Sequence, residues 1–218
     1  MITIAFEKKD NGIYVAHTDI LRSLNRTFRR AGILVNYSKG YNRHMNLKLT
    51  QPLPFGIASK EEWVTADIDE NYQAEEILRL FNENCPPYLY AYKAYKIDAN
   101  PNLGGKVVAS DYRIKSDKAI TFAQDILSKL KTLEITKTRG EQKTLRANEL
   151  IYKADIDTEG IYLLQAFGNI NLRIDLVAQE LNKLFDLDLT NTDLVRLNQY
   201  VMYEEKLVTA DEYIKSLI

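Results

Sequence analysis

The segment from Tyr14 to Gly56 constrains this chain more than any other part of its sequence. It contains both histidines, His17 and His44, and between His17 and Lys48 it carries seven Arg or Lys residues against a single acid, Asp19. The whole chain of 218 residues has a formal net charge of -1, so the remainder must be acidic. Such an asymmetry indicates one basic patch on an acidic body, and therefore an anionic partner.

A helix with two unlike faces is predicted from about residue 18 to residue 31. Thr18 or Asp19 is expected to cap its start, and Gly32 to end it. At about 100° per residue, one side of this helix is apolar and is formed by Ile20, Leu21, Leu24, Phe28 and Ala31. The opposite side carries four arginines, which are Arg22, Arg26, Arg29 and Arg30.

The arginine side of this helix favours an anion-binding role. A solvated helix face usually mixes both signs of charge, whereas arginines four residues apart repel each other by roughly a few tenths of a kcal/mol. Guanidinium groups also match the geometry of phosphate and carboxylate. Pairing with the chain's own carboxylates and plain solvation are the two alternatives.

The loop from Ser38 to His44 mixes aromatic rings, amides and cations between two extended pieces, 34–37 and 45–50. Lys39 and Arg43 are candidates to hold phosphate, together with the four arginines. Tyr37, Tyr41 and Asn42 are candidates to contact bases, because single-stranded nucleic acids are bound by stacking on aromatic side chains. The alternative is a loop whose rings pack on the protein itself. The glycine spacing matches no nucleotide-binding fingerprint.

The two histidines and the nearby acid are the candidate catalytic residues: His17, Asp19 and His44. Two imidazoles in one segment are compatible with general acid and base catalysis. A metal site would need a third ligand, which only Asp19 offers nearby, so no metal is predicted. The remaining alternative is that both histidines are structural or position a substrate.

The succession of predicted elements indicates an α+β protein. Residues 1–97 are expected to form a ferredoxin-like βαββαβ domain, with Ile13 to Ala16 returning as a short extra strand. Residues 98–106 are small and polar and are expected to be a linker. Residues 107–218 are expected to form a second α+β domain in which the same order roughly repeats, with residues 194–203 assigned to a strand.

The single cysteine, Cys85, excludes an internal disulfide, a cysteine-rich zinc site and a cysteine-ligated iron–sulfur cluster built from this sequence. No cofactor is predicted. Charged residues arrive early at the amino terminus, which is unlike a signal peptide, and no apolar run is long enough to span a bilayer. We therefore expect a cytoplasmic protein.

Several unusual pieces of this segment follow each other in a distinctive order. They are His17-Thr-Asp-Ile-Leu-Arg22, Arg29-Arg30-Ala-Gly, Tyr37-Ser-Lys-Gly-Tyr-Asn42 with His44, Pro52-Leu-Pro-Phe-Gly56 and Glu62-Trp63. In this the chain resembles the radical-SAM-linked proteins, a family built on a domain of unknown function. The sequence departs from that family's pattern at Ala16, where the family has Ser, and at Arg43 and Met45, where it has prolines.

The resemblance implies a domain fused to, or encoded beside, a radical-SAM enzyme, and it implies no reaction for the domain itself. We expect a non-catalytic module that binds an anionic substrate, RNA above all, for such a partner. The alternatives are a metal-independent RNA-processing or phosphate-ester enzyme that uses His17 and His44, and a protein adaptor for the radical-SAM enzyme. Because only Cys85 is present, the chain is not expected to be the radical-SAM enzyme itself.

Overall fold

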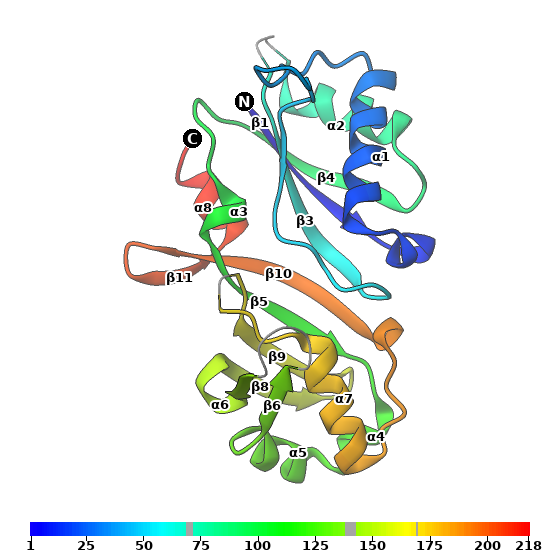
Figure 1. Ribbon diagram of the computed structural model, residues 1–218, viewed down its shortest axis with the longest axis vertical. Coiled ribbons are helices and arrows are strands. Elements are labelled where there is room, and N and C mark those ends of the chain that lie inside the picture. The colour runs from blue at the N-terminus through cyan, green and yellow to red at the C-terminus, as the bar shows by residue number, and fades with distance from the viewer. Residues whose placement is uncertain (69–71, 138–142, 169) are drawn as a thin grey trace.

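One nine-stranded sheet runs through both halves of the chain in the computed structural model (Figure 1). The structure describes residues 1–68, 72–137, 143–168 and 170–218. Seven strands follow one another in the order β4-β1-β3-β10-β5-β9-β8, while β2 pairs with β3 and β11 pairs with β10. The sheet therefore contains strands from both ends of the sequence in its centre.

The first half of the chain has the ferredoxin-like arrangement. Its strands lie in the order β4-β1-β3-β2, each neighbouring pair is antiparallel, and the two helices cross over between parallel strands. The elements are β1 (Ile2–Lys8), α1 (His17–Arg30), β2 (Leu47–Leu49), β3 (Ala58–Ala66), α2 (Ala74–Asn84) and β4 (Leu89–Lys96). The predicted α+β class is confirmed.

Helix α1 packs as its periodicity predicts. Ile20, Leu24 and Phe28 are buried against the sheet and α2, and the Phe28 ring meets that of Phe81 edge-on with 5.9 Å between centroids. Burying each such side chain stabilises the fold by roughly 1.5–3 kcal/mol. Gly32, with φ of 70°, follows the helix in the left-handed conformation that glycine favours. The predicted end of the helix is therefore confirmed.

The start of α1 differs from the prediction in two ways. The helix begins at His17 after Ala16, which makes no side-chain cap, so Thr18 and Asp19 lie inside the first turn. The expected short strand at 13–16 is also wrong, because η1 (Asp10–Tyr14) is a 3-10 turn there. Gly12 explains the tight turn, since a Cβ at this position would lie 2.9 Å from Cβ of Tyr88.

The second half repeats the arrangement of the first. Its strands lie in the order β10-β5-β9-β8, again antiparallel, with a β6–β7 hairpin and α6 inserted before β8. The helical segment 117–130 is divided at Phe122, and the predicted strand 194–203 is confirmed as β10. The elements are β5 (Val107–Ile114), α4 (Asp117–Thr121), α5 (Ala123–Leu130), β6 (Glu134–Lys137), β7 (Lys143–Arg146), α6 (Ala147–Leu150), β8 (Ile151–Asp157), β9 (Gly160–Ala166), α7 (Ile174–Phe185), η2 (Asn191–Asp193), β10 (Leu194–Tyr203), β11 (Lys206–Thr209) and α8 (Ala210–Lys215).

The two halves join where β10 runs parallel to the start of β3, with Val195 opposite Ala58 and Arg196 opposite Ser59. Strand β2 is only three residues long and covers the other end of the same edge of β3. It therefore leaves the first residues of β3 for β10. We call this junction, together with the segment 50–56 that lies over it, the seam.

The far face of the sheet is covered by two short helices near the junction. α3 (Leu103–Lys106) and α8 form a cluster with Trp63 of β3, in which Leu103 and Ile214 are buried. In Figure 1 both helices lie on the left of the view, and α1 and α7 lie on the right. Part of the expected linker 98–106 is thus helical and packed. The domain boundary placed there stays a prediction.

Candidate functional site

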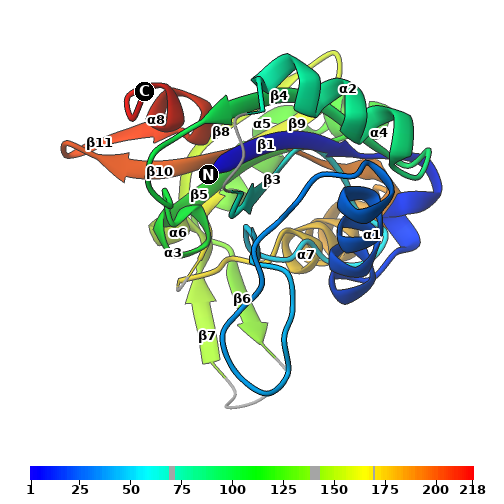
Figure 2. The same ribbon diagram turned by 90° about the horizontal axis from the view of Figure 1, so that it is seen from above.

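The carboxyl-terminal end of α1 and the loop 38–44 form one cationic surface. Arg29 Nη2 donates to the hydroxyl of Tyr37 at 3.3 Å, which joins the helix to the start of the loop. Arg30 donates through Nε to the carbonyl oxygen of Asn84 at 3.1 Å. Figure 2 shows the loop after α1 projecting from the body of the molecule on the α1 side of the sheet. We define the cationic surface as Arg26, Arg29, Arg30, Lys39, Tyr41 and Arg43.

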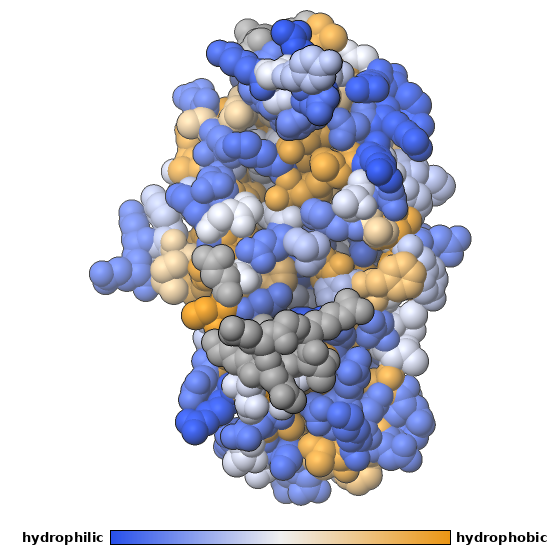
Figure 3. All heavy atoms as spheres, in the orientation of Figure 1, coloured by the Kyte–Doolittle hydropathy of each residue, from blue (hydrophilic) through white to orange (hydrophobic). Residues whose placement is uncertain are grey.

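The cations of this surface lack acidic partners in the part of the chain that the structure describes. Arg22, one turn before them, pairs with Asp19 at 2.7 Å, and this pair is exposed. No carboxylate of the described residues lies within 4.0 Å of the other arginines or of Lys39. Asp69 and Glu70 lie outside the described residues. In the space-filling view the edge of the molecule formed by α1 is hydrophilic (Figure 3).

The loop itself is closed at its base and exposed at its tip. Ser38 and His44 are joined by three hydrogen bonds, among them Ser38 N to His44 O at 2.8 Å and His44 N to Ser38 Oγ at 3.1 Å. The ring of Tyr41 is 103% exposed, and the neighbouring Lys39, Asn42 and Arg43 are exposed as well. His44 thus holds the base of the loop, and Tyr41 presents both ring faces to water.

His17 lies elsewhere, at the opposite end of α1. Its half-buried ring lines a narrow cavity together with Lys8 and Glu62, and burial lowers the pKa of this imidazole although Glu62 opposes the shift. Helix α1 has 14 residues, which at about 1.5 Å per residue corresponds to roughly 20 Å between its ends. The structure therefore does not bring His17 and Asp19 together with His44. The arginines are also divided, with Arg22 apart from Arg29 and Arg30.

A buried charge cluster lies at the seam beside His17. Arg196 of β10 is 0% exposed and pairs through Nη2 with the carboxylate of Glu62 on β3. Lys8 of β1 is also buried, and desolvation lowers the pKa of its ammonium group. Such burial is costly unless each charge is paired. Arg196 is not among the residues predicted from the sequence, although its position two residues after the buried Leu194 of a predicted strand was a usable signal.

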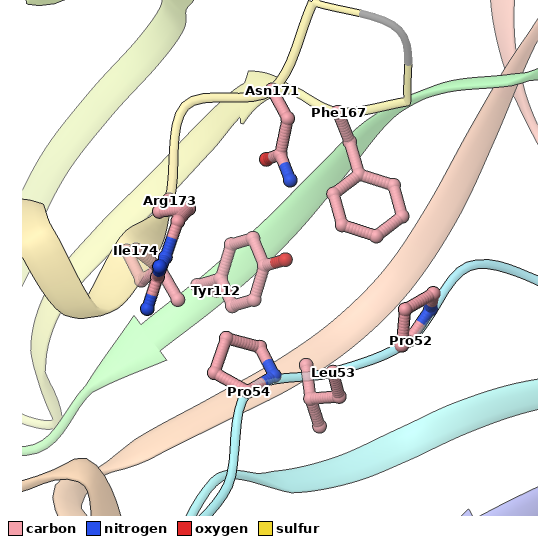
Figure 4. Close-up of a pocket in the computed structure, with 8 residues that line it drawn as sticks. All are labelled: Pro52, Leu53, Pro54, Tyr112, Phe167, Asn171, Arg173 and Ile174. Atoms are coloured by element: carbon pink, nitrogen blue, oxygen red, sulfur yellow. The ribbon is translucent and has the colours of Figure 1, made fainter. Parts of the chain in front are cut away.

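An open cavity of about 240 Å³ lies against segment 50–56, which separates it from the narrow cavity beside His17 (Figure 4). Leu53 lines both this cavity and the narrow one beside His17. In Figure 4 the amide of Asn171 points toward the ring of Tyr112. Burial raises the pKa of the Tyr112 phenol, which is therefore protonated at neutral pH. The cavity is lined by Pro52, Leu53, Pro54, Tyr112, Phe167, Asn171, Arg173 and Ile174.

Metal-binding groups and membrane-spanning helices are both absent from the described residues. No group of three or more His, Cys, Asp or Glu side chains in the described ranges is arranged to hold a metal ion. No helix among these residues is both long enough and apolar enough to cross a membrane. Neither finding identifies a partner or a reaction.

Comparison with known protein families gives a match. No protein with a curated description matches the sequence. The model of a family described as "Uncharacterized protein conserved in bacteria (DUF2344)" matches residues 1–183, which span the first ferredoxin-like unit and most of the second. Because this match covers well over half of the 218 residues, the chain belongs to the DUF2344 family of uncharacterized bacterial proteins.

Proposed function

We propose that this protein is a recognition module that binds single-stranded RNA on the cationic surface. The observation that carries the proposal is the fully exposed ring of Tyr41, which lies between the exposed Lys39 and Arg43 on a loop closed at its base. An aromatic ring flanked by cations binds one unstacked base and the phosphates on either side of it.

The arginines of α1 extend this surface along the path that a bound RNA strand would follow. Arg29 touches the loop through Tyr37, and Arg26 lies one turn earlier on the same face. A guanidinium group that has no carboxylate nearby keeps its donors for phosphate oxygens. Each phosphate that it neutralises releases counterions, so the affinity falls as salt increases.

The resemblance to radical-SAM-linked proteins supplies the context of this proposal. In that context the module presents RNA to a radical-SAM enzyme and performs no chemistry of its own. The alternative with His17 and His44 as an acid–base pair is disfavoured, because the two rings lie at opposite ends of α1. An adaptor role would be favoured instead if the protein co-purified with a radical-SAM enzyme in high salt and had no affinity for RNA.

The test is a fluorescence anisotropy titration with a labelled single-stranded RNA of about 12 nucleotides, a length within the range that such surfaces bind. The variant is Arg26→Gln, Arg29→Gln and Arg43→Gln combined. We expect its affinity to be weaker by roughly tenfold or more, because three phosphate contacts are lost. A double-stranded RNA of the same sequence is expected to bind more weakly, since its bases are not free to stack on Tyr41.

The matched control removes the same charge elsewhere, by Arg79→Gln, Lys129→Gln and Lys131→Gln combined. Arg79 and Lys131 are exposed and Lys129 is partly exposed, and they lie on α2 and at the end of α5. We expect this variant to bind RNA nearly as well as the wild type. Equal losses in the two variants, or no binding by the wild type at low salt, would refute the proposal.

A further inference from the structure

The sheet next to the seam contains an unusual concentration of buried polar atoms that have no hydrogen-bond partner among the described residues. Five of the seven such side-chain atoms belong to four residues of three adjacent strands, β10, β5 and β9. All four side chains are 0% exposed. The atoms are Arg196 Nε, Arg196 Nη1, Ser110 Oγ, Gln165 Oε1 and Gln199 Oε1.

The strand register places these four residues side by side. Ser110 of β5 is opposite Gln199 of β10 on one side and Gln165 of β9 on the other. Arg196 is opposite Tyr112, one row further along β5. Because neighbouring strands lie about 4.8 Å apart and residues i and i+2 share a face, the unpartnered groups form one patch on a single face of the sheet.

The orientation of both glutamines is fixed by their other atom. Gln199 Nε2 donates to the carbonyl oxygen of Glu61 at 3.0 Å, and Gln165 Nε2 donates to the carbonyl oxygen of Leu172. Exchanging the amide oxygen and nitrogen would place two acceptors against each other. The free atoms are therefore acceptors, while those of Arg196 are charged donors. Native structures rarely leave buried groups of this kind unpaired.

The open cavity of about 240 Å³ borders this patch. Tyr112 and Phe167 line it, and Cζ of Arg196 lies 5.2 Å from the centre of the Phe167 ring. Gln165 is bonded to Leu172, next to Asn171 and Arg173 in the cavity wall. The cavity also lies at the amino-terminal end of α7, where the helix dipole favours a negative charge. Apolar rings and prolines form most of the remaining wall.

The buried charges around the seam leave donors of Arg196 unused. Arg173 is paired with Asp175 through Nε at 3.1 Å. The buried Lys8 lies near the carboxylate of Glu62, and Glu61, a second buried glutamate of β3, accepts from Gln199 N at 3.2 Å. Only Nη2 of Arg196 is bonded to Glu62, so its Nε and Nη1 remain available to a carboxylate.

From these observations we infer that the seam is a binding site for a small ring-bearing monocarboxylate that also carries a hydroxyl or amino donor. The carboxylate pairs with the free donors of Arg196, the ring packs between the prolines of segment 50–56 and the rings of Tyr112 and Phe167, and the donor group meets a glutamine oxygen. This site is separate from the cationic surface and does not depend on the binding of RNA.

The test uses para-hydroxybenzoate as the probe and para-hydroxybenzamide as its neutral counterpart of the same shape, both titrated into the wild-type protein by isothermal titration calorimetry. We expect the acid to bind at millimolar concentration or below, with a Kd at least about tenfold lower than that of the amide, because a charged hydrogen bond is lost in the amide.

Two variants locate the binding. Leu53→Trp fills the cavity and leaves all charges in place, and we expect it to raise the Kd of the acid at least about tenfold. Leu184→Trp, the same change at an exposed position of α7, is expected to leave the Kd unchanged. Arg196→Gln, if it folds, should abolish the preference for the acid over the amide, and Arg26→Gln on the cationic surface should not.

Three results would overturn the inference. The first is equal binding of the acid and the amide. The second is unchanged binding of the acid by Leu53→Trp when its urea midpoint shows that it is folded. The third is no binding of the acid at millimolar concentration. In that case ordered water supplies the missing hydrogen bonds of the buried polar atoms. Each result is independent of the RNA titration, so the two proposals can fail separately.

Discussion

The cationic surface and the seam hold the same kind of side chain in opposite surroundings. Arg26 and Arg43 lie in water, where a charge costs nothing to solvate and is free to meet a partner. Arg196 is withdrawn from water completely and depends on Glu62. We therefore expect arginines of the first kind to act in binding from solution, and Arg196 to contribute to holding the two ferredoxin-like units together.

The largest expected effect that tests this comparison is on stability. Arg196→Met leaves the carboxylate of Glu62 buried without its partner, and we expect it to lower the free energy of unfolding by about 3–5 kcal/mol. Arg22→Met breaks a similar pair with Asp19 in an exposed position, and should cost less than about 1 kcal/mol. Urea denaturation followed by circular dichroism measures both. Similar losses in the two variants would remove the distinction between buried and exposed pairs.

The next effect concerns binding alone. Tyr41→Ala removes a ring that touches little of the folded protein, so we expect a loss of about 1–3 kcal/mol in affinity for single-stranded RNA. Its free energy of unfolding should stay within about 0.5 kcal/mol of the wild type. Anisotropy titrations and urea denaturation check the two parts. A Tyr41→Phe variant serves as the control and should retain the affinity.

A smaller effect concerns the dependence of binding on salt. Arg26→Gln should reduce the slope of log affinity against log salt concentration by about 0.7, which is the value expected for one contact to a single-stranded phosphate. The same titration with Arg79→Gln should leave the slope unchanged, because Arg79 is paired with Glu83 on α2. If both variants change the slope equally, the cationic surface is not the binding site.

The smallest effect is a dependence of stability on pH that originates at His17. Burial lowers the pKa of this imidazole, while Glu62 raises it and Arg196 and Lys8 lower it further. Below about pH 6.5 the unfolded chain therefore binds more protons than the folded protein. The free energy of unfolding should fall as the pH drops from about 6.5 to the folded-state pKa, and His17→Asn should remove this part of the slope. An identical slope in the variant would assign it to other groups.

The sequence predicted the parts of the fold that depend on local periodicity. The apolar face of α1, the end of that helix at Gly32 and the ferredoxin-like order of the first unit all follow from spacing and turn residues. The start of α1 was misplaced because Thr18 and Asp19 are both good capping residues, while Ala16 occupies the cap without a side-chain bond.

The seam could not be predicted from the sequence, and the reason differs from that for the start of α1. Glu62 and Arg196 meet only because β10 pairs with β3 across 134 positions of sequence, and no local pattern encodes that pairing. The sequence placed both histidines in one segment and suggested a common site. In three dimensions α1 holds them apart, since His17 is the first residue of the helix and His44 closes a loop after its end.

The shortness of β2 has a consequence for how the protein is made. The first residues of β3 leave the ribosome long before β10, the strand that covers their edge. Until then the nascent amino-terminal unit exposes an unsatisfied backbone edge with a carboxylate that still lacks its guanidinium. Such distant pairing slows folding and leaves partly folded chains prone to aggregate. Maturation of the first unit therefore waits until β10 has been synthesised.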